Sequence, residues 1–329
     1  MSPDRGRTPL ERWFLPDRSV WRAIGALVSV LVLGCLWNAD GAFFALGTHL
    51  DALWFIAPFG ILACGLTVVI ISGGIDLSVG SLVALSGVVF YLLLARHEVP
   101  GPIAAATAIG IASVCGVTSG LLVGFARVPP FIATLGMMAF ARGLAKSPWT
   151  SDNVKITQYP DPSFVAMLNA RIPPLGTPLI VPVFAVAAAC TWFFLRRLVS
   201  GTRTYAIGDN ERAAVCAGVP VRRVKLLAYS IGGLMAGLAG VFFAALERQG
   251  NPDGGTGYEL TAIAIVVVGG TSLAGGSGGA SLTVLGTLTI GYIRKILDIN
   301  AVETSTQNMI FGAIVVGAAL MQSVRPSRR

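Results

Sequence analysis

Charged residues are scarce in this sequence. Only 12% of its 329 residues are Asp, Glu, Lys or Arg, whereas 54% are hydrophobic and the mean hydropathy is +0.74. Soluble globular domains carry about 25% charged residues, so this composition excludes an ordinary soluble domain. It predicts an all-α, polytopic membrane protein with one compact membrane domain.

Residues typical of metal, disulfide and catalytic sites are also few. The two histidines, His49 and His97, lie far apart and away from clusters of Cys or carboxylates, so no metal site is expected. Four of the five cysteines fall in apolar runs and Cys216 lies in a basic loop, which argues against a disulfide framework. The sequence has no Gly-x-x-x-x-Gly-Lys-Ser/Thr loop and no evident pair of nucleophile and base. We therefore expect no cofactor and no enzyme activity, ATP hydrolysis included.

Ten apolar runs of roughly spanning length follow a polar and basic segment, residues 1–19. The runs cover residues 20–37, 50–71, 79–94, 102–125, 131–145, 179–195, 226–246, 260–273, 280–293 and 309–324. The predicted membrane domain is therefore 20–324, and a short polar tail, 325–329, follows it. Ten spans would place both termini on one side of the membrane.

The basic residues support that arrangement. The formal charge of +8 would suggest nucleic acid as the partner of a soluble protein, but here the basic residues flank apolar runs. Sixteen of the 24 Lys and Arg lie within residues 1–22, at Arg127, in the loop 196–225 and at the C-terminus. This bias predicts both termini and the loop 196–225 in the cytoplasm. The outer loop, 146–178, is long enough to meet a soluble partner, and a solvated connector fits it equally well.

The stretch 70–81, Ile-Ile-Ser-Gly-Gly-Ile-Asp-Leu-Ser-Val-Gly-Ser, places small polar residues and a carboxylate between two apolar runs. A carboxylate is costly within a bilayer, so Asp76 is expected to face the protein interior, cap a helix or contact a polar cavity. Gly73 and Gly74 permit a helix break, and Asp76 or Ser78 is placed to cap the next helix. A capped turn at the membrane surface and a solute-contacting site both fit this pattern.

The inner loop 196–225 predicts a short amphipathic helix bounded by Gly208 and Gly218, followed by a basic entry to the next span. Such a helix suits docking into a groove of another protein. A positively charged topology anchor is the alternative.

Two similar segments, here called the internal echo, occur in the two halves of the chain. Residues 73–77, Gly-Gly-Ile-Asp-Leu, are answered by residues 269–273, Gly-Gly-Thr-Ser-Leu, and each follows a run rich in Val and Ile. With ten spans, both segments lie between an inward-going and an outward-going helix, so a duplication would be parallel rather than inverted. Coincidence in a glycine-rich chain is the alternative.

Four motifs, in order, resemble the permeases of ribose- and galactofuranose-type ABC monosaccharide importers, in the branched-chain amino acid/ribose-type permease superfamily. They are Ile71-Ser72-Gly73-Gly74-Ile75-Asp76-Leu77-Ser78-Val79-Gly80-Ser81, Pro130-Phe131-Ile132-Ala133-Thr134-Leu135-Gly136 with Arg142-Gly143, Ala206-Ile207-Gly208 to Gly218-Val219, and Val268-Gly269-Gly270-Thr271. The resemblance covers nearly the whole chain from about Leu50 onward, and the galactofuranose-type branch is the most similar.

The resemblance implies a division of labour. Such permeases pair in the bacterial inner membrane, receive a monosaccharide from a periplasmic binding protein and are driven by a cytoplasmic ABC ATPase, which uses the ATP. This chain would then line the path of a pentose or hexose, with galactofuranose as one candidate, together with an identical or a different second permease chain.

Site residues are carried over by position. Those expected to line or support the path are Ser72, Gly73, Gly74, Asp76, Ser78, Ser81, Phe131, Thr134 and Arg142. Those expected to couple to the ATPase are Gly208, Asn210, Glu211, Ala213, Ala214 and Gly218. Small hydroxyl residues suit weak hydrogen bonding to a sugar, and they suit close helix packing equally well.

Two other classes of function fit parts of the sequence. A carboxylate near a helix break, at Asp76, is also compatible with an ion-coupled secondary transporter of a small polar solute. The absence of catalytic residues is compatible with a structural or receptor-like membrane scaffold.

Overall fold

The computed structural model describes residues 18–147 and 162–323, and nearly all of them are helical. The helices are α2 (Arg18–Leu36), η1 (Ala42–Phe44), α3 (Leu46–Ile71), α4 (Val79–Arg96), α5 (Gly101–Gly124), α6 (Pro130–Ala145), α7 (Pro162–Leu168), α8 (Ile180–Arg197), α9 (Val199–Asp209), α10 (Glu211–Cys216), α11 (Val221–Glu247), α12 (Tyr258–Gly269), α13 (Ala280–Ile299) and α14 (Thr304–Ser323). Two short strands, β1 (Arg171–Ile172) and β2 (Thr177–Pro178), form an antiparallel pair.

Each of the ten predicted apolar runs falls on one helix. Five of the predicted limits differ from the helix ends by four to six residues. The runs that start at 50 and 226 start too late, because α3 begins at Leu46 and α11 at Val221, and the run that ends at 293 is too short, because α13 ends at Ile299. The run 260–273 is too long, because α12 ends at Gly269. The next residue, Gly270, takes a left-handed φ of 104°, and this conformation excludes a further helical turn. The run 309–324 starts too late, because α14 begins at Thr304 and its first turn is polar.

Six of the described helices are long and apolar enough to cross a membrane: α2, α3, α4, α5, α8 and α11. Two further apolar helices, α6 and α12, are shorter. With 12 residues, α12 is about 18 Å long, less than the roughly 30 Å of a hydrocarbon core, so it does not span that core by itself. The count of ten spans stays a prediction.

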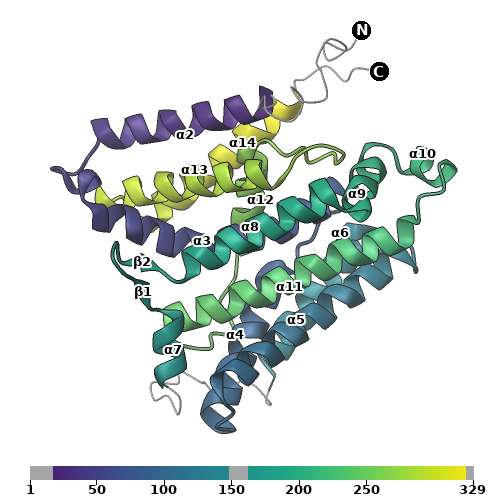
Figure 1. Cartoon of the computed structure of the whole chain (residues 1–329), viewed down its shortest axis with the longest axis horizontal. Coiled ribbons are helices and arrows are strands. Elements are labelled where there is room, and N and C mark those ends of the chain that lie inside the picture. The colour runs from purple at the N-terminus through teal and green to yellow at the C-terminus, as the bar shows by residue number, and fades with distance from the viewer. Residues whose placement is uncertain (1–17, 148–161, 324–329) are drawn as a thin grey trace.

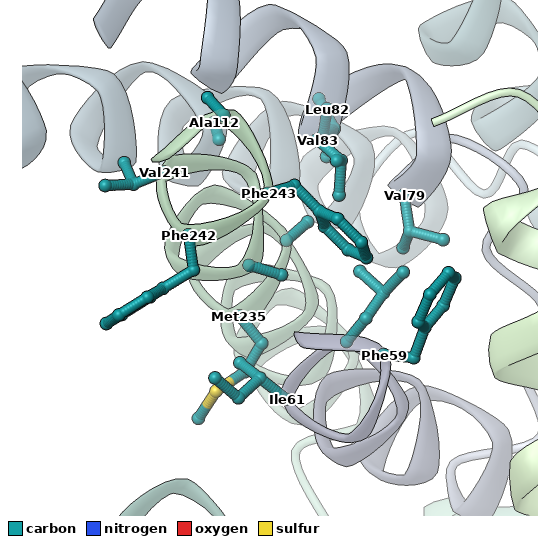
Figure 2. Packing of buried hydrophobic residues seen from close by; sticks show 14 of the residues in the cluster. Phe59, Ile61, Val79, Leu82, Val83, Ala112, Met235, Val241, Phe242 and Phe243 are labelled. Carbon is teal, nitrogen blue, oxygen red and sulfur yellow. The ribbon is translucent and has the colours of Figure 1, made fainter. Parts of the chain in front are cut away.

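The core is built around α3, α4 and α11. All residues from 56 to 71 in α3 and from 78 to 91 around α4 are buried, which is typical of helices that are apolar on every side. Figure 2 shows how Phe59 of α3, Val79 and Val83 of α4, and Phe243 of α11 point toward one another. These three helices fix the position of the segment that joins α3 to α4.

Glycines allow α5 and α11 to approach closely. A methyl group on Gly116 of α5 would lie 2.6 Å from the carbonyl oxygen of Tyr229, and one on Gly233 of α11 would lie 2.7 Å from that of Ala112. The obstacles are backbone atoms, which cannot rotate away as a side chain would. This glycine seam is the membrane-helix packing in which small residues bring two backbones together.

Figure 1 shows where the ends of the elements lie. The first turn of α2 and the last turn of α14 lie at the same end of the molecule as α9 and α10, whereas α7 and the β1–β2 pair lie at the opposite end. Residues 1–17 and 324–329 lie outside the described part of the chain, so the prediction that the two termini share one side with the loop 196–225 stays a prediction. Which side faces the cytoplasm stays a prediction, as do the domain limits at residues 19, 20, 324 and 325.

The predicted outer loop 146–178 contains α7 and β1–β2. Residues 148–161, which carry several of the polar residues of this loop, lie outside the described part of the chain. The idea that the loop meets a soluble partner therefore stays a prediction.

Candidate functional site

The segment 72–78, here called the broken segment, joins α3 to α4 without helical structure of its own. Gly73 takes a φ of 77°, and the amide of Gly74 donates to the carbonyl of Val69 over 3.0 Å while that of Gly73 donates to Ile70 over 2.9 Å. This pair of bonds is the glycine closure that ends many helices, in which a left-handed residue satisfies the last free carbonyls. The predicted break at these glycines is therefore present.

Asp76 lies at the centre of the broken segment and is completely buried. Its Oδ1 accepts hydrogen bonds from the backbone amide of Ser78, at 2.8 Å, and from the Ser78 hydroxyl, at 2.6 Å. Among the described residues, Oδ2 has no hydrogen-bond partner. The carboxylate thus braces the turn that leads into α4. Ser78 occupies the cap position, but its hydroxyl serves Asp76 rather than a helix amide.

The four predicted hydroxyl residues all point into the subunit. Ser72, Ser78, Ser81 and Thr134 are each no more than 2% exposed. The hydroxyl of Ser72 donates to the Val69 carbonyl over 2.6 Å, and that of Thr134 donates to the Pro130 carbonyl over 2.9 Å. Of the two readings of the sequence, the geometry supports packing within the subunit.

The exposed face of the broken segment is apolar. Ile75 is 42% exposed and Gly73 is exposed as well, whereas Gly74 between them and Asp76 after them are buried. The buried face is held by Tyr229 of α11, whose hydroxyl donates to the Ile75 carbonyl over 3.3 Å. Gly74 leaves room for that ring, because a methyl group there would lie 2.5 Å from the Tyr229 oxygen. The sequence analysis did not identify Tyr229. The one feature of the sequence that could have indicated its role is a hydroxyl group within the apolar run 226–246.

The inner loop differs from the prediction. Gly208 does not bound a single helix but lies inside α9, and Asn210 separates α9 from α10. The Asn210 side chain accepts a hydrogen bond from the amide of Ala213 at 3.0 Å, which is the capping interaction that starts a new helix. Gly218 ends α10 with a φ of 76°, as its predicted place requires.

The predicted coupling residues on α10 face two directions. Ala213 is exposed, and so is Glu211, whose carboxylate pairs with Lys225 at 2.7 Å. Ala214 is only 4% exposed and packs with Ile207 and Val224. The prediction that both alanines form a docking surface is therefore wrong for Ala214, because its side chain points inward.

The internal echo has matching geometry with a shift of one residue. Gly270 ends α12 as Gly73 ends α3: the amide of Thr271 donates to Val266, five residues back, and that of Gly270 donates to Val267, three back. Gly218 closes α10 with the same two spacings. Since a helix outside the echo ends in the same way, this geometry does not distinguish duplication from coincidence, and the repeat stays a prediction.

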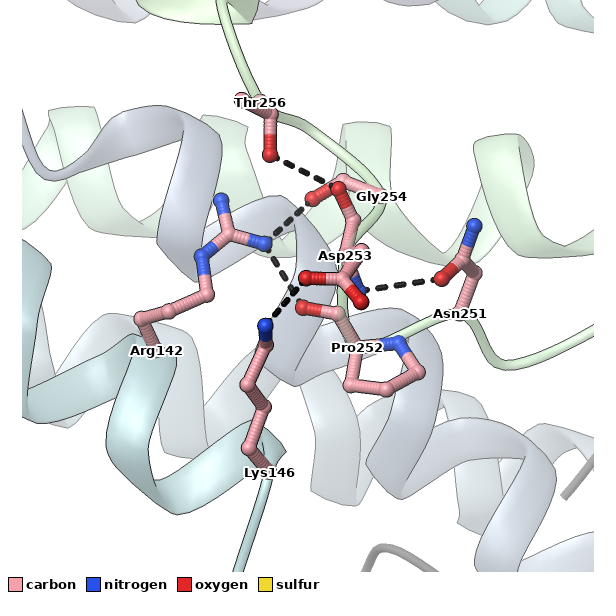
Figure 3. A network of polar contacts seen from close by, with 7 residues as sticks. All are labelled: Arg142, Lys146, Asn251, Pro252, Asp253, Gly254 and Thr256. Atoms are coloured by element: carbon pink, nitrogen blue, oxygen red, sulfur yellow. Dashed lines mark hydrogen bonds and ion pairs between the residues drawn. The ribbon is translucent and has the colours of Figure 1, made fainter. Parts of the chain in front are cut away.

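Arg142 has structural partners at the end of α6. Its Nη1 donates to the carbonyl oxygens of Pro252 and Gly254, each over 2.7 Å, and so ties α6 to the loop between α11 and α12 (Figure 3). Lys146 forms an ion pair with Asp253 of the same loop. Phe131, at the other end of α6, is 54% exposed and does not join this network.

The exposed ion pair responds to pH. The hydrogen bond from Lys146 holds the pKa of the Asp253 carboxyl below its ordinary value. A lowered pKa in the folded protein means that the pair stabilises the loop above the ordinary pKa of Asp, about 3.9. That contribution is lost as the pH falls through the lowered pKa.

Arg142→Ala is expected to loosen the loop 251–257. The change leaves the Pro252 and Gly254 carbonyls without their charged donor, and hydrogen bonds to charged groups contribute about 1.5–3 kcal/mol. Amide hydrogen exchange in this loop should accelerate at least about tenfold, since 1.4 kcal/mol corresponds to a factor of ten. Gly143→Ala, next to it in an open position of the same helix, is the control and should leave exchange unchanged. Equal exchange in Arg142→Ala and the wild type would refute the tether.

Comparison with known proteins places this chain among permeases. The family described as "Branched-chain amino acid transport system / permease component" matches residues 49–319. The chain is 34% identical to the ribose import permease protein RbsC of Escherichia coli K12, over 94% of each chain. It is 35% identical to RbsC of Bacillus subtilis 168, over 91% of this chain and 90% of the relative. It is also 34% identical to the galactofuranose transporter permease protein YtfT of E. coli K12, over 91% of this chain and 86% of the relative. No solved structure matches the chain.

Proposed function

The chain belongs to the branched-chain amino acid transport system permease family, and from this premise we propose that it is the membrane-spanning subunit of an ATP-binding cassette importer for a monosaccharide. Its similar relatives are permease subunits named for ribose, galactofuranose and allose transport. It is accordingly a multi-pass protein of the bacterial inner membrane. In the proposed assembly, a separate cytoplasmic ATPase supplies the energy and a periplasmic binding protein delivers the sugar.

One observation carries the proposal beyond family membership. The broken segment interrupts the buried core between α3 and α4, and the two-helix segment α9–α10 contacts the end of α3 at that break: the Cα of Gly208 would lie 3.7 Å from a methyl group on Gly73. An irregular segment within a helical bundle is tolerated where it is buried in protein or lines a cavity. Gly208 belongs to α9, and the exposed α10 follows it after Asn210, so a displacement of α10 is placed to act on this segment through α9.

The exposed face of the broken segment, Gly73 and Ile75, is proposed to line the path or to contact the second permease chain. A path between two subunits needs contacts that release a sugar readily, and apolar surface with few fixed polar groups meets that need. Asp76 then acts from behind this face as a brace. The substrate is proposed to be a pentose or hexose, and the second chain to be identical or different.

An ion-coupled secondary transporter is less consistent with these findings. Asp76 is fully buried and already engaged by Ser78, and the similar relatives are named as permease components of importers. A scaffold role has no specific observation in its favour.

Ala213→Trp and Ala214→Trp should separate docking from folding. The exposed Ala213 tolerates an indole within the free subunit, so this variant should be as stable as the wild type. Its association with the ATPase should weaken about tenfold, because an added side chain clashes with a partner docked on this face. The buried Ala214 has no such space, so its variant should unfold at lower temperature. Thermal unfolding and co-purification of the ATPase measure the two effects. Full ATPase recruitment by Ala213→Trp would refute a docking role for this face.

The proposed function is tested by sugar-dependent ATP hydrolysis. The chain is co-purified with its ATPase and second permease chain in lipid nanodiscs, and binding protein is added with or without ribose, allose or galactofuranose. We expect hydrolysis to rise on addition of the loaded binding protein and to require the permease. A rate of ATP hydrolysis that changes neither when the permease is omitted nor when any loaded binding protein is added would contradict the proposal.

A further inference from the structure

Three segments far apart in the sequence meet at a cluster of glycines: Gly73 in the broken segment, Gly208 in α9, and Gly275 and Gly276 in the loop between α12 and α13. We call this cluster the glycine junction. The contacts are between backbones. A methyl group on Gly275 would lie 3.0 Å from the Gly73 Cα and 3.0 Å from the Gly208 oxygen, and one on Gly208 would overlap the carbonyl oxygen of Ile71.

Two hydrogen bonds fasten the junction. The amide of Gly276 donates to the carbonyl of Ile71, the last residue of α3, over 3.0 Å. The hydroxyl of Tyr205, one turn before Gly208 in α9, donates to the carbonyl of Gly278 over 2.9 Å. Thus α9 is bound to the α12–α13 loop, and that loop is bound to the end of α3.

Side chains reinforce the same connection. Val68 and Ile71 of α3 form a buried cluster with Leu195 of α8 and Ala228 of α11, and Tyr205 packs against it. The last residues of α9 therefore cannot shift without moving either the end of α3 or the α12–α13 loop, because closely packed interiors transmit displacement. Asn210 alone separates this end of α9 from α10.

We propose that the glycine junction is the link through which a displacement of α10 reaches the broken segment and the α12–α13 loop together, with Gly208 and Tyr205 as positioning residues for transport. The proposal rests on the proposed function, since it takes α10 to be the surface that the ATPase moves. It assigns the two glycine-rich breaks of the chain to one moving unit.

The geometry dictates which changes disturb the link. Gly208→Ala forces α9 away from Ile71 and from the amide of Gly276, which a methyl group would approach to 2.5 Å, while α10 keeps its exposed face. Tyr205→Phe removes only the hydroxyl that holds Gly278 and adds no atoms. Gly136→Ala is the control, because this helical glycine of α6 has no atom within 4 Å of the added methyl group.

The test measures the number of sugar molecules transported per ATP hydrolysed by the full complex in proteoliposomes, with a radiolabelled monosaccharide selected by thermal-shift screening of the binding protein. For Gly208→Ala we expect this ratio to fall about tenfold or more while sugar-stimulated hydrolysis persists. The added methyl group pushes α9 away from the end of α3 and from the α12–α13 loop, so the contact that transmits the displacement is lost. For Tyr205→Phe we expect a fall of about fivefold, the equivalent of one typical hydrogen bond. Gly136→Ala should keep the wild-type ratio.

The outcomes separate the two proposals. If the wild-type complex shows no ATP-dependent uptake, both the proposed function and this inference are refuted. If the wild type transports and both variants keep its ratio, the junction is not the link and only this inference is overturned. If Gly208→Ala does not assemble, Tyr205→Phe decides: a lowered ratio with normal assembly supports the link, and an unchanged ratio overturns it.

Discussion

Asp76→Ala is expected to lower sugar uptake about tenfold or more without preventing membrane insertion. The change leaves the amide and the hydroxyl of Ser78 buried without their acceptor, and each such loss costs about 1–3 kcal/mol. The broken segment would then lose the turn that presents Gly73 and Ile75, while all of the apolar helices remain. Uptake in proteoliposomes and the amount of inserted protein are the measurements. Wild-type uptake by a normally inserted variant would refute a role for Asp76 in transport.

Asp76→Asn is the matched control. Only Oδ1 of Asp76 accepts hydrogen bonds from the described residues, and the Asn side chain keeps an oxygen that can take its place. We therefore expect the Asn variant to retain most of the wild-type uptake. A loss as large as that of Asp76→Ala would show that the negative charge itself is needed, which would favour an ion-coupled mechanism.

Gly116→Ala is expected to destabilise the subunit, because the added methyl group faces the backbone of α11. The added carbon would lie 2.6 Å from the backbone oxygen of Tyr229, so α5 and α11 must separate. Overpacking of this kind costs about 1–3 kcal/mol, and we expect the midpoint of thermal unfolding to fall by several degrees.

The control for that change lies on the same helix. Gly110 has no atom within 4 Å of an added methyl group, so Gly110→Ala should leave the midpoint unchanged or raise it, since Ala favours a helix. Equal midpoints for the two variants in detergent would contradict the close packing of α5 on α11.

Ten of the described helices could be predicted because each coincides with an apolar run bounded by glycine, proline or polar residues, whereas α7, α9 and α10 have no such run. Asp76 between Gly73 and Ser78 likewise predicted an interruption of the helix, since a carboxylate and glycines rarely interrupt an apolar run without a structural reason. The family resemblance, carried by motifs spread over most of the chain, is confirmed by the comparisons.

Other features depend on contacts that the sequence does not encode locally. Gly73 and Gly275 are some two hundred positions apart, and neither motif indicates that they touch. The partners of Arg142 are backbone carbonyls, which leave no signature in the sequence. The inward direction of Ala214 is set by packing against Val224 of the next helix, so the alanine pair alone did not reveal which one is exposed.

The central claim is that this chain moves a monosaccharide with energy from a partner ATPase. Uptake of radiolabelled sugar into proteoliposomes containing the complete complex tests it most directly, with ATP or an imposed proton or sodium gradient as the only energy source. We predict uptake that requires ATP, the ATPase and the binding protein, and that no ion gradient replaces. Uptake by this chain without the ATPase, driven by an ion gradient, would contradict the account.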